Sequence, residues 1–288
     1  MTRRRRLPDA TLNRLVLGFE RNDIRLAKAW QPKLERNFRK LAREAVGAYR
    51  DVMAAEVGKA HLPGEAPLEG QAAVAADEAL TKRVMRALAK RLGGPPNSWR
   101  DVVLRRSIVT QYDTVFNATV NRVQTTLGMV INVPDPVAHR VIQTGGTRLG
   151  LVDVDKQTTD AIFRALHDGR SQNLGTRELE RSIRSMVEGG PSKRVSTRAM
   201  RIARTETTYA RNISTLASYE SSGAFATVII WDNRTGYDDP DCMARNGREV
   251  SFREAQTMID AEHPNGTIAL APGSVNTDAD RRARQPAD

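Results

Sequence analysis

The chain has 288 residues, of which 40% are hydrophobic and 5% are aromatic, and its formal net charge is +11. This hydrophobic content excludes a disordered chain and suffices for one sizeable core or two smaller ones. The shortage of aromatic residues, with abundant Ala, Leu, Arg and Glu, favours helices over a β-sandwich. We therefore predict a mainly α fold, with an extended N-terminal helical region followed by a helical core and a small C-terminal α+β module.

Basic residues are concentrated near the N-terminus. The first 50 residues contain 14 Lys or Arg and five Asp or Glu, whereas residues 231–288 contain seven and 11. A basic field of this kind attracts phosphate or an acidic protein surface. Because no aromatic residues are interleaved for base stacking, a solvated or protein-docking face remains an alternative to contact with non-specific double-stranded DNA. The candidate contact residues are Arg3, Arg4, Arg5, Arg6, Arg25, Lys33, Arg36, Arg39 and Lys40.

Three features bear on where the chain acts. A single cysteine, Cys242, excludes an internal disulfide and fits synthesis in a reducing cytoplasm. The basic start is followed by Pro8, Asp9 and Asn13 rather than by an apolar segment, so no export signal is predicted. The longest apolar run, 226–231, is far shorter than the ~20 residues that cross a bilayer. We expect no membrane partner.

The N-terminal half is predicted to form a series of amphipathic helices, each with an apolar stripe along one face. Asp9 can cap the first helix, which Pro32 is predicted to kink or break. A Pro/Gly linker covers 61–70, a second helix covers about 71–92, and the Ser98–Asp101 spacing predicts a capped third helix. Turn residues at 133–136 and glycines up to 150 place the main boundary there. Residues 1–150 are thus expected to form a helical arm or bundle whose stripes need cover from a partner.

Residues 151–225 are expected to form a helical core of three helices. The first starts at Asp155, the second runs from Thr176 to Gly189, and the third runs from Arg198 to Ser222. The third helix has a broad apolar face with Glu206 in its middle. A carboxylate there needs a cationic or amide partner from another segment, so a structural pair is favoured over a catalytic acid with a raised pKa. The apolar positions are Ala199, Ile202, Ala203, Tyr209, Ala210, Ile213, Leu216 and Ala217.

Residues 226–271 are expected to form the small α+β module. A buried strand covers 226–231, Asn246-Gly247 predicts a tight hairpin turn before a short strand at 248–250, and a last strand covers 267–270. Ser251 and Glu254 form a capping box that opens a helix to about residue 260. The remaining residues, 272–288, are predicted to be a disordered tail.

Several motifs follow one another between about residues 155 and 270. They are a Gly-Arg-Ser-x-x-Leu-Gly-Thr-Arg-Glu-Leu segment at 169–179, the run Ile-Ala-Arg-Thr-Glu at 202–206 with Ala210 and Asn212, Trp231, Asp-Cys at 241–242, Asn-Gly at 246–247 and His-Pro-Asn at 263–265. In this order they resemble the phage head morphogenesis, or MuF-like minor capsid, proteins of tailed bacteriophages. The structural motif residues of the resemblance are Arg204, Glu206, Asn212, Trp231, Asp241, Gly247 and His263.

The resemblance implies a minor structural protein inside the phage head, made in the host cytoplasm and present in several copies near the portal. It would act in head assembly, DNA packaging or ejection, with the portal protein, the major capsid protein or a scaffolding protein as partners. Gly266 and Thr267 stand where many relatives have cysteines. Cys242 and His263 alone supply two of the usual four zinc ligands, and Asp238, Asp239 and Asp241 offer only oxygens. We therefore predict neither a metal nor another cofactor.

Two other functions remain open at the level of the sequence. One is a DNA-binding regulator with a helix-turn-helix-like segment between 155 and 220, which would expose Arg204, Thr207, Thr208 and Arg211. The other, less favoured, is a phage-borne nuclease or transferase that uses Glu206. Against an enzyme, the sequence contains no Ser/His/Asp set and no paired carboxylates at a defined spacing. We expect no catalytic residues.

Overall fold

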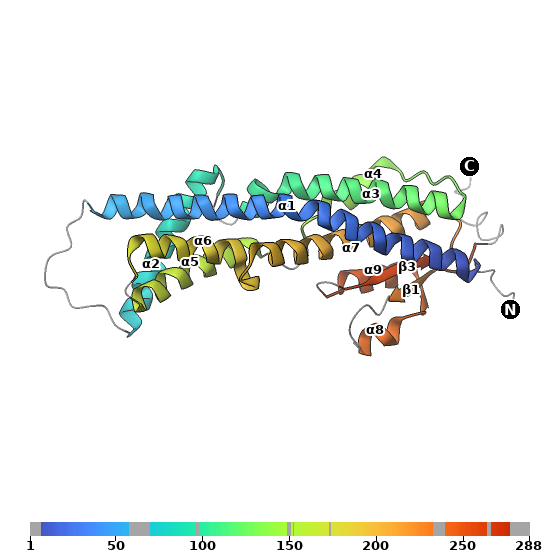
Figure 1. Cartoon of the computed structure of the whole chain (residues 1–288). Coiled ribbons are helices and arrows are strands. Elements are labelled where there is room, and N and C mark those ends of the chain that lie inside the picture. The colour runs from blue at the N-terminus through green and yellow to red at the C-terminus, as the bar shows by residue number, and fades with distance from the viewer. Residues whose placement is uncertain are drawn as a thin grey trace. The chain divides into compact units, whose positions relative to one another are not determined.

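The computed structural model describes residues 7–57, 70–95, 98–148, 151, 153–172, 174–232, 240–263 and 266–276, with side chains except at 56, 57, 100, 232, 241 and 242. The chain is mainly helical and has a small three-stranded antiparallel sheet near its C-terminus, as the sequence predicted (Figure 1). None of the described helices is long and apolar enough to cross a membrane. The predicted contact residues Arg3 to Arg6 lie outside the described residues.

The elements follow one another along the chain as a run of helices and then a sheet with two short helices. The helical run comprises α1 (Asp9–Val57), α2 (Gly70–Leu92), a π-helical turn (Arg100–Leu104), α3 (Arg105–Leu127), α4 (Asp135–Gln143), α5 (Val154–Ser171), α6 (Thr176–Gly189), a 3-10 turn (Gly190–Ser192) and α7 (Val195–Ser222). The remainder comprises β1 (Val228–Asp232), α8 (Pro240–Arg245), β2 (Glu249–Val250), α9 (Phe252–Asp260) and β3 (Ile268–Pro272).

Three predictions for the N-terminal half need correction. Helix α1 contains Pro32 and is not broken there. The Ser98 hydroxyl makes no capping hydrogen bond to the π-helical turn that follows it, and it donates a 2.7 Å hydrogen bond to the Pro95 carbonyl. The residues at 133–136, predicted to form a turn, instead lead into α4, and prolines at its start fit the first turn of a helix.

The chain folds into two compact units that interleave in sequence. Unit one contains the residues up to Ala29, 108–145 and those from Ala203 onward; unit two contains 30–107 and 146–202. This division differs from the predicted boundary near residue 150, because α1 and α7 each contribute to both units. The first half of the chain is therefore packed with the second half in each unit.

The core of unit two joins α1, α2, α5 and α6. Its buried residues include Leu41, Leu88, Trp99, Ile162 and Ile183. Two partly buried polar contacts join elements around this core: Asp77 on α2 pairs with Arg170 on α5, and the amide of Trp99, just before the π-helical turn, donates a 3.0 Å hydrogen bond to Asp155 on α5. The apolar stripe of this part of α1 is thus covered by the chain itself.

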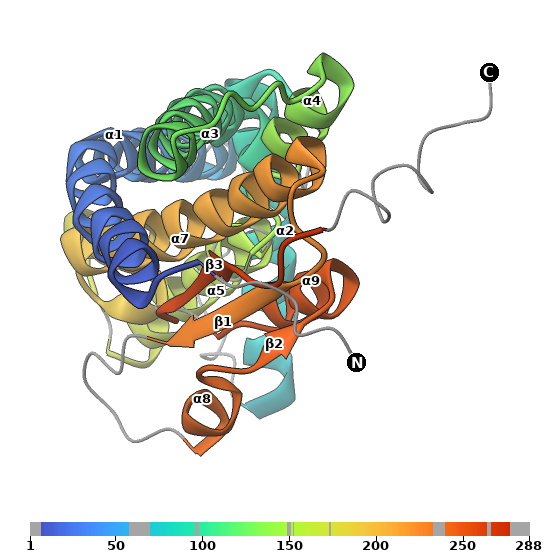
Figure 2. The same cartoon turned by 90° about the vertical axis from the view of Figure 1, so that its right-hand side faces the viewer.

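Unit one contains the sheet, with strand order β2-β1-β3 (Figure 2). Strand β1 pairs antiparallel with both neighbours, with Val228 opposite Val250 in β2 and Ile230 opposite Leu270 in β3. A small core connects the start of α1 to this sheet and includes Leu12, Val16, Ile229, Ala269 and Ala271. The apolar residues at the start of α1 are therefore covered by the sheet of the same chain, and they need no partner protein to cover them.

The C-terminal module matches its predicted elements closely. The Ser251 hydroxyl accepts a 3.1 Å hydrogen bond from the Glu254 amide and caps α9, as predicted. Gly247 has φ 78°, which favours glycine, but the turn follows the short helix α8 instead of closing a β-hairpin. Described residues beyond 271 also belong to the module: Pro272 pairs with Val228 in the sheet, the Ser274 carbonyl accepts from the Ala226 amide, and the Asn276 amide donates to the Ala224 carbonyl. The predicted disordered tail, as far as 272–276, is thus ordered; residues 277–288 lie outside the described part.

Candidate functional site

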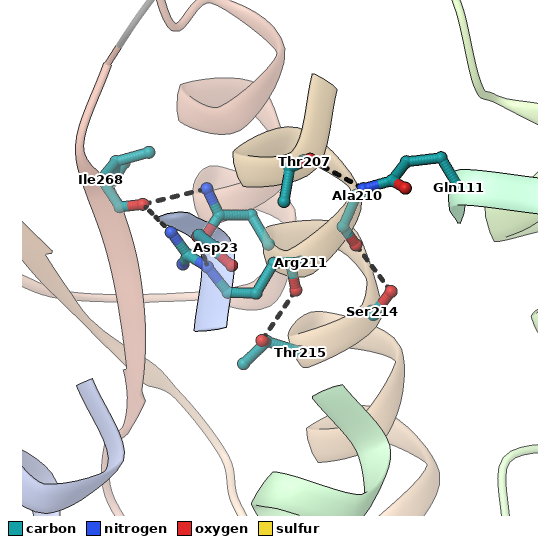
Figure 3. Close-up of polar contacts among 9 residues, drawn as sticks. Asp23, Gln111, Thr207, Ala210, Arg211, Ser214, Thr215 and Ile268 are labelled. Atoms are coloured by element: carbon teal, nitrogen blue, oxygen red, sulfur yellow. Dashed lines mark hydrogen bonds and ion pairs between the residues drawn. The ribbon is translucent and has the colours of Figure 1, made fainter. Parts of the chain in front are cut away.

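The densest set of buried polar contacts surrounds Arg211 on α7. Its Nε donates to Asp23 Oδ2 on α1 at 3.0 Å, and its Nη2 donates to the Ile268 carbonyl on β3 at 2.9 Å (Figure 3). Asn212 accepts from Arg211 and donates its own Nδ2 to the same Ile268 carbonyl at 3.0 Å. The guanidinium also lies 5.5 Å from the centroid of the Phe19 ring. One side chain therefore links α1, α7 and β3.

Asp23 is the acidic half of this pair and is only 8% exposed. Burial raises the pKa of the Asp23 carboxyl to about 6, and the nearby Arg211 charge opposes that rise without cancelling it. Its second oxygen, Oδ1, has no hydrogen-bond partner among the described residues. Among the described residues, only the Oδ2 atom of the carboxyl is therefore hydrogen-bonded, to Arg211.

Glu206 is buried, at 1% exposure, as the sequence predicted. It accepts a hydrogen bond from the Tyr112 hydroxyl on α3. The sequence predicted a cation or an amide as the partner of Glu206, whereas the partner on α3 is a tyrosine hydroxyl. A hydroxyl can also donate a hydrogen bond to a buried carboxylate. The preceding residue of α3, Gln111, donates to the Thr207 hydroxyl at 3.1 Å (Figure 3). These contacts fix α3 against α7.

The polar face of α7 is buried as well as its apolar face. Thr207 and Thr215 are 0% exposed and Arg211 is 3% exposed. The hydroxyls of Ser214, Thr215 and Ser218 donate to carbonyls four residues earlier in the same helix. Of the four residues proposed to read DNA, Thr207 and Arg211 are thus buried inside unit one, Thr208 is partly buried and Arg204 is exposed.

Two hollows in unit one adjoin α7. The first, beside Asp23, Arg204 and Arg211, encloses about 70 Å³, which is small compared with the ~300–1,000 Å³ of sites for organic ligands. The second, about 570 Å³, lies among α4, α7 and α9. Its lining includes apolar side chains, among them Val141, Ile213 and Leu216, and charged side chains of both signs, Arg140, Glu220, Arg253 and Asp260. No predicted motif residue lines the second hollow.

The other motif residues differ in their surroundings within unit one. Trp231 lies in β1 and packs against the small core of α1 and the sheet. The Gly247 amide donates to the Ile230 carbonyl and joins the turn to β1. His263 is half exposed, with Nε2 3.9 Å from Glu262. The side chain of Asp241 lies outside the described residues. Trp231 and Gly247 thus make contacts that build the unit.

The predicted surface contacts on α1 are exposed where the structure describes them. Arg25 donates to Asn22 at 2.8 Å, and Arg39 forms a 3.0 Å ion pair with Glu35. Lys33, Arg36 and Lys40 have no such contact with described residues. Within the described part of the chain, no three His, Cys, Asp or Glu residues are placed to hold a metal ion.

Sequence reasoning missed the roles of Asp23, Arg211, Gln111 and Tyr112. Asp23 did carry a signal, since it follows Phe19 by four residues and precedes Leu26 by three, which places it on the apolar stripe of α1. For the others, the pairing depends on which helix covers α7, and this is not visible in the sequence. Comparisons with family models, with curated proteins and with solved structures gave no match.

Proposed function

We propose that this chain is a minor structural protein of a tailed-phage head, present in several copies near the portal inside the procapsid. It acts in head assembly, DNA packaging or ejection through protein contacts rather than by catalysis. The portal protein is the expected partner, with the major capsid or a scaffolding protein as further candidates.

The main support is the part played by the motif residues of α7 and the sheet. Asn212, Trp231 and Gly247, which carry the resemblance to MuF-like proteins, each join one element of unit one to another. Glu206 is held by a tyrosine hydroxyl inside the unit. A motif that is used to assemble a unit fits a structural protein better than an enzyme, whose motif residues converge on a substrate.

A DNA-reading regulator gains less support. Thr207 and Arg211, two of the four residues that would read bases, are buried among α1, α3 and β3. Base readout needs side chains that reach a groove. The regulator could use this face only if unit one opened.

The test is co-expression of the full chain with the portal protein encoded in the same genome, followed by size-exclusion chromatography. We expect the two proteins to elute together, and heads assembled without this chain to be defective in packaging or ejection. The genes flanking this one give an independent check, since portal and capsid genes are expected there. Separate elution together with flanking genes of another kind would overturn the proposal.

A further inference from the structure

Four cations in unit two form a row on the exposed side of α1. Lys33, Arg36, Lys40 and Arg43 follow one another at spacings of three, four and three residues, so they fall on one face of the helix. All four are exposed. The row spans ten residues, or about 15 Å along the helix axis. The buried stripe that contains Leu34, Phe38 and Leu41 lies on the opposite side.

None of these four side chains has an ion pair or hydrogen bond with the described residues. Four other cations of unit two are paired: Arg39 pairs with Glu35, Arg50 with Glu180, Lys156 with Asp160, and Arg91 with both Glu44 and Asp51. The row, which we call the α1 basic face, therefore keeps its charge uncompensated by neighbouring carboxylates. Four like charges in a row repel one another and favour an anionic partner.

The face has the chemistry of a phosphate-backbone contact. Each Lys and Arg offers N–H donors to phosphate oxygens, and a row of cations on a rigid helix suits a row of phosphates on a rigid duplex. Single strands are instead held by aromatic side chains that stack on bases. The aromatic residues of this part of α1, Trp30, Phe38 and Tyr49, are buried. These buried aromatic rings cannot stack on the bases of a single strand.

We propose that the α1 basic face binds the phosphate backbone of double-stranded DNA without sequence preference. Lys33, Arg36, Lys40 and Arg43 each neutralise phosphate and release counterions. The inference concerns unit two alone and does not depend on the function proposed above. Arg39, although predicted as a contact, is outside the set because Glu35 compensates it.

The test compares two full-length variants with the same loss of charge. One carries K33Q, R36Q, K40Q and R43Q; the control carries R39Q, R50Q, R91Q and K156Q, whose side chains are 52%, 61%, 36% and 78% exposed but already paired. Affinity for a duplex of random sequence is measured by fluorescence anisotropy between about 50 and 200 mM salt. Circular dichroism and thermal melts of both variants establish that they are folded.

We expect the first variant to bind more than tenfold more weakly and its log–log salt dependence to be shallower by about 3 to 4, since each phosphate contact contributes about 0.9 to the slope. The control is expected to stay within a few-fold of the parent. Equal losses in the two variants would show that only net charge matters and would overturn the proposal. So would a parent chain that prefers polyglutamate or single-stranded DNA to the duplex, since these point to an acidic protein or to a stacking surface.

Discussion

Glu206 is the residue whose environment constrains the fold most directly. It is 1% exposed and accepts from Tyr112 on a different helix. We expect Glu206→Ala to destabilise the protein by about 2–4 kcal/mol, because the tyrosine hydroxyl is left in a buried site without this acceptor. Glu206→Gln keeps an acceptor oxygen and should cost about half as much or less.

Urea unfolding of both variants measures these differences. Glu78→Ala on the exposed side of α2 is the matched control and should change the free energy of unfolding by less than about 0.5 kcal/mol. If Glu206→Ala unfolds at the same urea concentration as the parent, the carboxylate is solvated and α7 does not pack as described.

Asp23 makes the stability of the protein depend on pH. Its pKa is about 6 in the folded chain because of burial, whereas an unfolded Asp titrates near ~3.9. Between these values the folded state holds a proton that the unfolded chain releases. The stabilising contribution of Asp23 is therefore complete below about pH 4, falls as the pH rises through 6, and is constant above.

Asp23→Asn cannot titrate, so the stability of the parent relative to this variant should fall by up to about 3 kcal/mol from pH 4 to 7. Chemical denaturation at several pH values gives this difference directly. Asp160→Asn, at an exposed ion pair, is the control and should show little change. If the relative stability of the parent rises with pH, the Arg211 charge outweighs burial at this carboxyl.

Among the elements, two helices with the same start signal behave differently. Ser251 and Ser98 are each followed three residues later by an acidic residue, but only Ser251 caps its helix. We expect Ser251→Ala to cost about 1 kcal/mol and Ser98→Ala less than about 0.5 kcal/mol. Thermal or urea melts of the two variants measure the contrast. A loss at Ser98 as large as the loss at Ser251 would contradict this contrast, because it would mean that the Ser98 hydroxyl stabilises the segment before the π-helical turn as strongly as a helix cap does.

The elements that the sequence predicted best are those with a long apolar stripe. Helices α1, α2, α6 and α7, and the strand that ends at Trp231, follow from local periodicity, which is dictated by the face each element buries. Helix α4 was missed because a Pro-containing start is shared by turns and first helical turns. The Arg211 contacts could not be predicted, since they join residues 188 and 57 positions apart in sequence.

At the scale of the whole molecule, the interleaving of the two units decides how the chain can be divided. Unit one combines 9–29 and 108–145 with residues from 203 onward, and unit two combines 30–107 with 146–202. Division of the chain at residue 150 would therefore split the core of each unit between the two fragments. It removes α3 and its Gln111 and Tyr112 contacts from α7, and α1 and α2 from α5 and α6.

We expect fragments 1–150 and 151–288, expressed separately, to lack cooperative melting and to be degraded quickly by protease, because each retains only half of two cores. Expressed together, they should associate and recover the circular dichroism spectrum and the protease resistance of the intact chain. Limited proteolysis and size-exclusion chromatography of the three samples measure this. If 151–288 alone were monomeric, protease-resistant and cooperative in its melting, its helices would not need α1 and α3, and the N-terminal half would after all be a separable arm that is free to dock on a partner.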